Sequence, residues 1–256
     1  MIRLGTSGFS YEDWIGEVYP QDLPRWKWLP YYSTLFNTVE LNVTYYRLTS
    51  SKTATGWVAR TPEDFTFSVK AHRGLTHERK QPDFNAFKQS LAPLIESGKL
   101  TCVLAQFPHS FHPTPSNRDY LSKFREGLPE LPLVVEFRDS AWVSEQTFEL
   151  LHSLSLGFCC VDEPALKGLM PPVVRATGPV AYVRFHGRNA ARWWKHDHAW
   201  ERYDYTYTES ELSEWVPRLV ELDTASPLTL AYANNHYRGQ SVDTMRKLNR
   251  LLMTDD

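Results

Sequence analysis

The sequence is poor in cysteine and has no long apolar run. Of its 256 residues 3 are cysteines, and Cys102, Cys159 and Cys160 all lie within apolar segments. An odd number of thiols in such segments excludes a disulfide framework and is typical of a reducing compartment. No run of roughly 18 apolar residues occurs, so the sequence predicts no membrane span. The residues from Met1 to Gly5 lack the apolar stretch of a signal peptide, and we expect a cytoplasmic protein.

The chain also lacks an excess of charge of either sign. Lys and Arg total 28 against 30 Asp and Glu, which gives a net charge of −2. This balance excludes a protein whose binding rests on bulk positive charge. Hydrophobic residues make up 42% and charged residues 23% of the chain, so it can bury a core and is not disordered.

A regular series of short apolar runs, separated by helical patterns, extends through the chain. Each run is about four to eight residues long and rich in β-branched or aromatic residues, as expected of strands. Repeated strand–helix units predict a parallel sheet, and eight such units close into a (β/α)8 TIM-like barrel of the α/β class. The predicted strands are Ile2–Thr6, Thr38–Val43, Phe65–Ala71, Leu100–Phe107, Leu133–Arg138, Leu156–Asp162, Val180–His186 and Leu228–Asn234.

Capping patterns and apolar stripes predict several of the helices. Ser144 is placed to cap one helix, and Thr208 with Glu211 forms a capping box before another. Ser241 is placed to cap the last helix. Apolar side chains at helical spacing predict a further helix over residues 84–95.

The chain reads as one domain spanning residues 1–256, with an irregular, aromatic-rich insertion at about 187–207. An open, doubly wound sheet is the alternative fold. That fold usually carries a Gly-rich phosphate loop after its first strand, and Gly5-Thr6-Ser7-Gly8 is too short for that motif. No low-complexity linker divides the chain, which favours the barrel.

Charged residues fall late in the predicted strands, on one face of each. In a barrel the apolar face of a strand meets the outer helices and the polar face points inward. The carboxyl ends of barrel strands are also where barrel enzymes place their active sites. The predicted catalytic residues at this end are Glu40, Lys70, Glu136, Asp162 and His186, and the predicted substrate-binding residues are Asn42, Gln106, Arg138, Arg184, Asn234, Asn235 and Arg238.

Each of these residues also has a purely structural interpretation. The three carboxylates are suited to general acid–base chemistry or to a hard divalent metal, but they can equally pair with Lys70 and the arginines. Lys70 could form a Schiff base if its pKa were depressed, although an ion pair is the commoner outcome. No HExxH or CxxC motif is present, and His109-x-x-His112 lies among prolines, so no motif demands a metal.

Two loops predict an anion site. Many barrels hold a phosphate in the loops after strands seven and eight. Here Arg184 and Arg188 flank the first loop, and Arg238 with Gly239 precedes the last predicted helix. Guanidinium groups and free helix N–H groups favour an anion such as phosphate.

Aromatic residues alternate with cations between Arg192 and Tyr207. Such faces can stack on bases or sugars, so nucleic acid is a possible partner. The alternative is a lid whose rings pack on the barrel rim. The aromatic residues are Trp193, Trp194, Trp200, Tyr203, Tyr205 and Tyr207.

Several motifs together resemble the YecE-like family, a domain of unknown function (DUF72). The resemblance extends over nearly the whole chain and implies a TIM-like barrel, but the family brings no established activity from which catalytic residues could be transferred. One departure is Asp139-Ser140, where the family pattern has a His-Pro-like pair. The matching motifs are Gly5-Thr6-Ser7-Gly8 with Tyr11 and Trp14, Val39-Glu40-Leu41-Asn42, Thr44-Tyr45-Tyr46, Phe67-x-Val69-Lys70, Thr76-His77, Gln106-Phe107-Pro108, Val135-Glu136-Phe137-Arg138, Arg184-x-His186-Gly187, Tyr203-x-Tyr205 and Asn234-Asn235.

Three hypotheses about function follow from the sequence. The first is a hydrolase or lyase that acts on a small anionic, phosphate-bearing substrate by carboxylate acid–base or metal-assisted chemistry. The second is a nucleic-acid-binding protein or a barrel resembling repair nucleases. The third is a non-catalytic scaffold in which the ion network only closes the barrel mouth.

Overall fold

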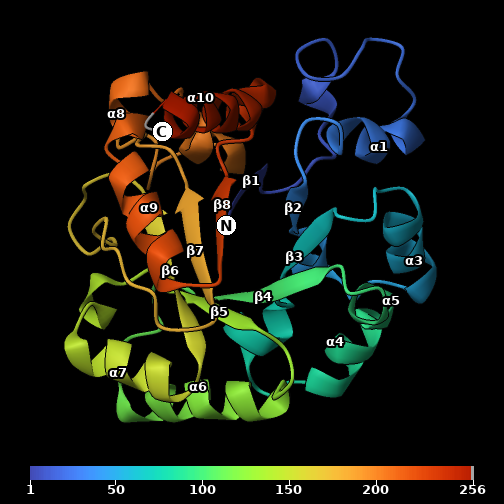
Figure 1. Cartoon of the computed structure of the whole chain (residues 1–256). Coiled ribbons are helices and arrows are strands. Elements are labelled where there is room, and N and C mark those ends of the chain that lie inside the picture. Colours follow the sequence, from blue (N-terminus) through green and yellow to red (C-terminus); the bar gives the residue numbers. More distant parts are fainter. Residues whose placement is uncertain (255–256) are drawn as a thin grey trace.

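Eight parallel strands form a nearly closed barrel in the computed structural model, which describes residues 1–254 (Figure 1). The sheet order β1-β8-β7-β6-β5-β4-β3-β2 places every strand beside its neighbour in sequence and brings β8 back to β1. This confirms the predicted TIM-like barrel. The strands are β1 (Ile2–Thr6), β2 (Thr38–Leu41), β3 (Thr66–Lys70), β4 (Leu100–Gln106), β5 (Leu133–Glu136), β6 (Leu156–Asp162), β7 (Val180–Phe185) and β8 (Leu228–Ala233).

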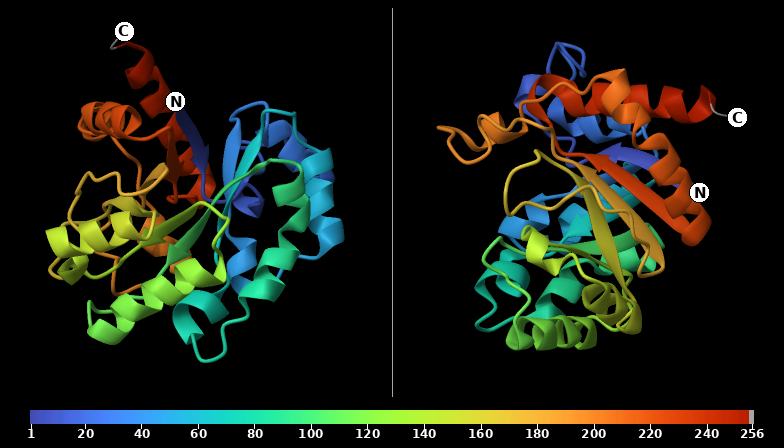
Figure 2. Two further views of the ribbon diagram at one scale, coloured as in Figure 1. Left: turned by 60° about the horizontal axis from the view of Figure 1, so that its bottom comes forward. Right: turned by 90° about the vertical axis from the view of Figure 1, so that its left-hand side faces the viewer.

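Helices surround the strands on the outside of the barrel (Figure 2). They cover the outward apolar side chains, such as Val39, Val135 and Val183, which are fully buried. The α-helices are α1 (Trp28–Tyr32), α2 (Val43–Tyr46), α3 (Ser51–Ala59), α4 (Phe84–Ser90), α5 (Ala92–Glu96), α6 (Pro115–Gly127), α7 (Glu145–Ser153), α8 (Glu209–Ser213), α9 (Val216–Ala225) and α10 (Gln240–Thr254). Shorter turns are the 3-10 helices η1 (Glu12–Trp14), η2 (Arg25–Lys27), η4 (Ser140–Trp142), η5 (Ala199–Tyr203) and η6 (Tyr237–Gly239), and the π-helix η3 (Gly74–Glu78).

The helix predictions are confirmed in part. The Ser144 hydroxyl caps α7, and Thr208 with Glu211 forms the capping box of α8. The predicted helix over 84–95 is divided into α4 and α5, because Pro93 lies in the first turn of α5 and cannot continue α4. Ser241 does not cap the last helix, since α10 already begins at Gln240.

The strand–helix alternation is also less regular than predicted. Within the described chain, residues 163–179 connect β6 to β7 without a helix. The connection from β7 to α8 projects beyond the carboxyl ends of the strands (Figure 2, right) and contains the short helix η5. The aromatic-rich segment 187–207 lies within this connection.

The barrel has a seam between β1 and β2. Along the described residues these strands share one isolated bridge, between Ser7 and Glu40, instead of a continuous ladder. Below this bridge the Tyr32 hydroxyl accepts a hydrogen bond from the Thr6 N–H (2.9 Å) and donates one to the Thr38 carbonyl (3.2 Å). A tyrosine side chain from α1 therefore links the two strands across the seam.

Polar side chains fill the barrel interior in pairs. The hydroxyls of Thr38 and Tyr232 lie 2.6 Å apart, and those of Ser68 and Tyr182 lie 2.9 Å apart. All four residues are fully buried, so these hydrogen bonds satisfy groups that water cannot reach. Above them, nearer the carboxyl ends of the strands, lies the charged layer described below.

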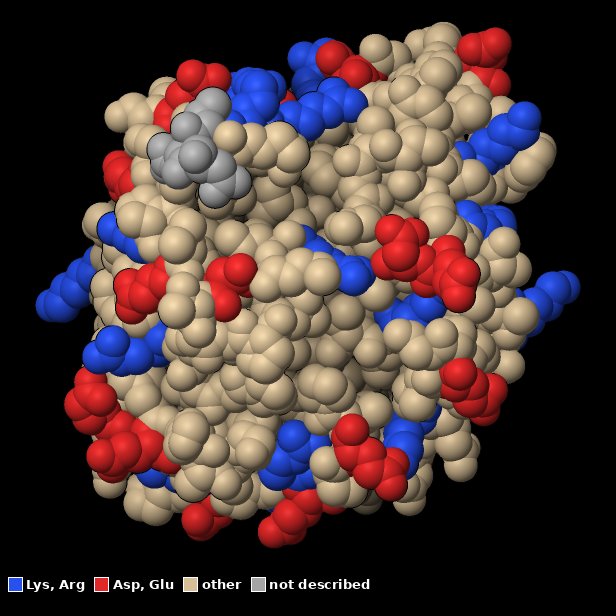
Figure 3. All heavy atoms as spheres, in the orientation of Figure 1, with Lys and Arg blue, Asp and Glu red and all other residues tan. Residues whose placement is uncertain are grey.

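The exterior carries mixed charge. On the face seen in Figure 3, Lys and Arg side chains are interspersed with Asp and Glu, with uncharged areas between them. Among residues 1–254, no helix combines the length and the apolar character that crossing a membrane requires. Cys102, Cys159 and Cys160 are buried free thiols whose pKa burial raises.

Candidate functional site

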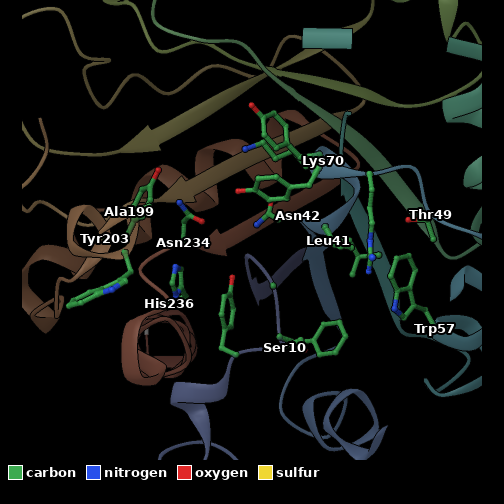
Figure 4. A pocket seen from close by; sticks show the side chains of 18 of the residues that line it. Ser10, Leu41, Asn42, Thr49, Trp57, Lys70, Ala199, Tyr203, Asn234 and His236 are labelled. Carbon is green, nitrogen blue, oxygen red and sulfur yellow. The ribbon is translucent and has the colours of Figure 1, made fainter. Parts of the chain in front are cut away.

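A cavity of about 1010 Å³ opens at the carboxyl ends of the strands. Its wall is formed by the segment after β1, the segment from the end of β2 into α3, and the projecting loop after β7. In Figure 4, Asn42 and Lys70 lie on one side of the cavity, and Tyr203, Asn234 and His236 lie across from them. The cavity thus occupies the end of the barrel where the sequence predicted a site.

The charged side chains that line this cavity are all cationic. They are Arg47 on the rim and Lys70, Arg138 and Arg184 deeper in the cavity. No Asp or Glu of the described chain is among the lining residues. The cavity therefore offers positive potential to a ligand, with aromatic walls around it.

The carboxylates lie beneath the cavity and hold Arg184. The Arg184 guanidinium donates to Glu40 Oε1 and to Glu136 Oε2, both at 2.7 Å. All three residues are at most 1% exposed. Strand parity therefore predicted correctly that β2, β5 and β7 bring these three side chains together, but the carboxylates serve as ion-pair partners of Arg184.

Further hydrogen bonds and charges hold this layer together. The Tyr182 hydroxyl donates to Glu40 Oε2 at 2.7 Å. Burial alone would raise the pKa of Glu136, but Arg138, Arg184 and His186 around it hold that pKa well below its ordinary value. Glu136 is therefore a carboxylate, held by charge-assisted hydrogen bonds.

His186 is part of the same layer and does not line the cavity. It is fully buried, with Nε2 3.1 Å from Glu136 Oε1 and Nδ1 3.1 Å from the Asn234 amide. Burial, together with the charge of Arg138, lowers the pKa of His186 to about 3. The ring is therefore neutral at physiological pH and orients the Asn234 side chain, which does line the cavity.

Lys70 differs from Arg138 and Arg184 because its amine has no ionic partner within the described part of the chain. Among residues 1–254, no hydrogen bond or salt bridge engages Lys70 Nζ, which lies 4.6 Å from the centre of the Tyr45 ring. Burial, with Arg184 nearby, lowers the pKa of Lys70 to about 8. The ion pair that the sequence favoured for this lysine is not formed, because Arg138 and Arg184 occupy the neighbouring carboxylates.

The structure adds His77, on the π-helix η3, to the surroundings of Lys70. Its ring lies 5.0 Å from that of Tyr45, and its Nδ1 is 2.9 Å from the Thr76 hydroxyl. Burial, together with the charge of Lys70, lowers the pKa of His77 to about 4. The family motifs Thr76-His77 and Thr44-Tyr45-Tyr46 are the sequence signal that pointed here. π-Helical turns occur often at functional sites.

Glu163 is a second residue that the sequence did not single out. It directly follows β6 and accepts hydrogen bonds from the Arg138 guanidinium (3.2 Å) and from the Met170 N–H (2.9 Å). Burial raises the pKa of Glu163 to about 7. Arg138 thus lies between Glu136 and Glu163. The sequence signal for Glu163 is its position directly after Asp162, the last residue of β6.

Asp162 lies at the end of β6 but does not line the cavity. Its carboxylate accepts hydrogen bonds from Arg188, from the Tyr207 hydroxyl and from the Trp215 indole, at 2.6–2.7 Å for the shortest bond of each residue. It therefore anchors both ends of the projecting loop after β7 to the barrel. This arrangement indicates a positioning role for Asp162.

The predicted amide residues are divided between the cavity and its supports. Asn42 and Asn234 line the cavity. The Gln106 amide donates to the Phe107 carbonyl at 2.8 Å and is not a lining residue. The Asn235 amide donates to the Tyr205 carbonyl and the Thr244 hydroxyl, so it ties the projecting loop to α10.

Arg238 is not brought to the cavity that Arg184 lines. Arg238 is exposed, and its backbone N–H donates to the Asp13 carboxylate at 2.6 Å. Arg188 is likewise engaged, with Asp162 and Glu214. The positive groups that meet in this structure are Lys70, Arg138 and Arg184, and not the predicted combination of Arg184 with Arg238.

The aromatic residues of the insertion have divided roles. Trp193 and Tyr207 are buried, as expected of a lid packed on the barrel rim. Trp200 and Tyr203 line the cavity, and Trp200 stacks on Tyr237 with ring centres 4.1 Å apart. Other rings of the wall come from segments outside the insertion; they are Phe9, Tyr11, Tyr45, Tyr46, Trp57 and His236.

The carboxylates and histidines do not form a ready metal site. Across residues 1–254, no three or more His, Cys, Asp or Glu side chains are grouped so that they could hold a metal ion. Glu40 and Glu136 are instead separated by the guanidinium of Arg184.

Comparisons with known proteins identify the family. Over residues 3–256 the chain matches the family described as "Protein of unknown function DUF72". It is 35% identical over 270 residues to the UPF0759 protein YunF of Bacillus subtilis, covering 98% of this chain and 95% of that protein. A DUF72 family protein from Thermotoga maritima shares 41% identity and a TM-score of 0.92 over the full length of both chains.

A second DUF72 structure, from Enterococcus faecalis, shares 28% identity and a TM-score of 0.88 over 99% of this chain and 96% of that chain. These matches agree with the motifs that run through the sequence and with the barrel. The chain therefore belongs to the DUF72 family.

Proposed function

We propose that this protein is an enzyme that binds a small anionic substrate in the cavity at the carboxyl ends of the strands. The observation that carries the proposal is the charge of the lining: Arg47, Lys70, Arg138 and Arg184 face the cavity, and no Asp or Glu of residues 1–254 is among the lining residues. The carboxylates that pair with Arg138 and Arg184 lie beneath the cavity, so the surface that a ligand meets is cationic. A phosphate- or carboxylate-bearing substrate matches this lining.

The residues take different parts in this proposal. Arg138 and Arg184, with the amides of Asn42 and Asn234, bind the anion. Glu40 and Glu136 are positioning residues, because they hold the guanidinium groups from below at 2.7–2.9 Å. Lys70 is the group that exchanges a proton with the substrate, since its amine lines the cavity and its pKa of about 8 is near physiological pH.

This assignment moves the acid–base chemistry from the carboxylates to Lys70. A carboxylate that accepts charge-assisted hydrogen bonds is a weak base, and the low pKa of Glu136 makes it a poor proton acceptor. Hydrolysis and elimination both remain compatible with a lysine that removes a proton. The metal-assisted variant has less support, because no cluster of metal-binding side chains among residues 1–254 faces the cavity.

The nucleic-acid hypothesis has less support than a small ligand. Of the aromatic residues proposed as a stacking platform, Trp193 and Tyr207 are buried in the structure. Trp200 and Tyr203 instead form part of a cavity wall, where they face the cationic floor. A single small anion that carries a ring would contact both the aromatic wall and the cationic residues of the cavity.

Phosphate binding tests the proposal. A thermal-shift titration with phosphate at constant ionic strength should stabilise the wild-type protein, with a millimolar dissociation constant as expected for about 4 kcal/mol of binding free energy. Lys70→Met and Arg138→Met should weaken the phosphate-specific shift at least severalfold. Lys88→Met, which removes a cation from an exposed surface pair with Glu130, is the matched control and should respond like the wild type. Equal responses of all four proteins would overturn the proposed anion site.

A further inference from the structure

We propose that Lys70 forms an imine with the carbonyl group of an aldehyde or ketone substrate that also carries the anionic group. This inference rests on the proposed function for the binding of the anion. It gives Lys70 a nucleophilic role in place of proton exchange, and it names the reacting group of the substrate. The geometry that carries it is an amine at the end of β3, inside a cavity lined by cations, with no ionic partner among residues 1–254.

The contrast with Lys99 shows what is unusual about Lys70. Lys99 is more buried than Lys70, but its ammonium donates to the carbonyls of Val58, Thr61 and Pro62 and to the Thr61 hydroxyl at 2.6–3.3 Å. Those oxygens satisfy a charged ammonium group. Lys70 Nζ has no such acceptors among residues 1–254 and lies over the face of Tyr45.

The surroundings of Lys70 favour the neutral amine. Arg138 and Arg184 already neutralise Glu136 and Glu40, so a third positive charge gains little from those carboxylates. Burial and Arg184 lower the pKa of Lys70 to about 8, so roughly a tenth of the amine is unprotonated at pH 7, which is far more than for an exposed lysine. A neutral lysine in a desolvated cavity is the form that attacks carbonyl carbon.

The cavity also has room and partners for the rest of the substrate. Its volume of about 1010 Å³ far exceeds what an isolated anion needs. Arg138 and Asn42 line the same cavity as Lys70 and can hold a phosphate or carboxylate. An anionic aldehyde or ketone is therefore the substrate class that uses both the cations and the free amine.

The step is balanced without a further reactant. The lone pair of Lys70 Nζ attacks the carbonyl carbon, a C–N bond forms, and the carbonyl π electrons move to oxygen. The nitrogen gives up one of its two protons and the oxygen takes one up, which gives a neutral carbinolamine. A second proton moves to the oxygen, which leaves as water while the nitrogen lone pair forms the C=N bond, and the nitrogen then releases its remaining proton. Amine and carbonyl compound thus give imine and water, with no net oxidation or reduction.

Reductive trapping tests the proposal. The full chain is incubated near pH 7.5 with pyridoxal 5′-phosphate, an aldehyde that carries a ring and a phosphate, in the presence of cyanoborohydride. Peptide mass mapping should show the reduced adduct on Lys70 at a rate at least about tenfold above that on exposed lysines, because each unit of pKa changes the free-amine fraction about tenfold. Inorganic phosphate should slow this labelling, and Lys70→Arg should abolish it.

Two controls separate this proposal from the proposed function. Pyridoxal, which lacks the phosphate, should label Lys70 several times more slowly; equal rates would support the imine but contradict the anion site. Adducts confined to exposed lysines, in a protein that still binds phosphate in the thermal-shift titration, would overturn the imine and leave the proposed function standing. Lys70→Arg should melt near the wild-type temperature, because Lys70 Nζ forms no hydrogen bond or salt bridge within residues 1–254.

Discussion

At the scale of single residues, Glu163 is a carboxyl group whose charge state changes near neutral pH. Its carboxyl group is buried against Arg138, and its pKa is raised to about 7. In the unfolded chain the same group titrates near 4.5. Between these two values the folded protein keeps a proton that the unfolded chain has released. The contribution of Glu163 to the free energy of unfolding therefore falls as pH rises from about 4.5 to 7.

Glu163→Gln should remove this dependence. Across that pH window, the free energy of unfolding of the variant minus that of the wild type should increase by up to about 1.4 kcal/mol per pH unit. Urea denaturation at several pH values measures the difference. Glu145→Gln, which removes an exposed carboxylate paired with Arg175, controls for the loss of one negative charge. A difference that stays constant from pH 4.5 to 7 would show that Glu163 does not titrate as stated.

Residue-level chemistry was the least predictable part of the site. Strand parity placed Glu40, Glu136 and Arg184 together, because period-two alternation follows directly from sequence. It could not show that Arg184 takes up both carboxylates and leaves Lys70 without a partner, since that choice depends on side-chain distances. Glu163 was missed because it follows the strand, where parity no longer applies.

At the scale of elements, the projecting loop after β7 begins at a glycine that no other residue replaces easily. Gly187 has a φ of 87°, and a Cβ atom there would lie 2.6 Å from Tyr205 Cβ. Its N–H also donates to the Tyr207 hydroxyl at 2.9 Å. The two ends of the loop are therefore bonded to each other, through Gly187 and Tyr207. This contact holds the intervening residues Trp200 and Tyr203 at the cavity.

Gly187→Ala should both destabilise the protein and disturb the cavity. The left-handed backbone alone costs about 1–2 kcal/mol for a residue with a Cβ, and the contact with Tyr205 adds to this. Gly98→Ala is the matched control, because Gly98 has a φ of 68° but nothing within 4 Å of an added Cβ. Chemical denaturation and the phosphate titration should show a larger loss of stability for Gly187→Ala, and weaker phosphate binding for that variant alone. Equal effects of both substitutions would show that the loop is not fixed at Gly187.

Elements were predicted better than the connections between them. All eight strands were located within two residues of their ends, because buried parallel strands form short continuous apolar runs. The connections depend on contacts between distant residues. The Arg238 N–H is held by Asp13, which is 225 positions earlier, and no local pattern predicts that contact.

At the scale of the whole molecule, the cavity and the seam lie at the same place in the barrel. Gly8, Phe9 and Tyr11 follow β1, and Leu41 and Asn42 lie at the end of β2, so both strands of the seam lead into the cavity wall. The fold was predictable because eight strand–helix units have few ways to close. The position of the seam was not predictable from the sequence, since it depends on the side chain of Tyr32 in α1, which bonds to both strands.

The seam gives this barrel a property that a fully laddered barrel lacks: two potential edge strands that face each other. The Tyr32 hydroxyl occupies the Thr6 N–H and the Thr38 carbonyl, which would otherwise be free to pair with a strand of another chain. Tyr32→Phe should lower the free energy of unfolding by about 1–3 kcal/mol and increase association between chains on mild heating, as measured by light scattering. Tyr31→Phe, one residue earlier on the same helix, is the control and should remain monodisperse. Equal scattering by both variants would show that the Tyr32 hydroxyl does not prevent pairing of the strand edges. Stronger scattering by Tyr32→Phe alone would show that Tyr32 protects the barrel against aggregation as well as linking β1 to β2.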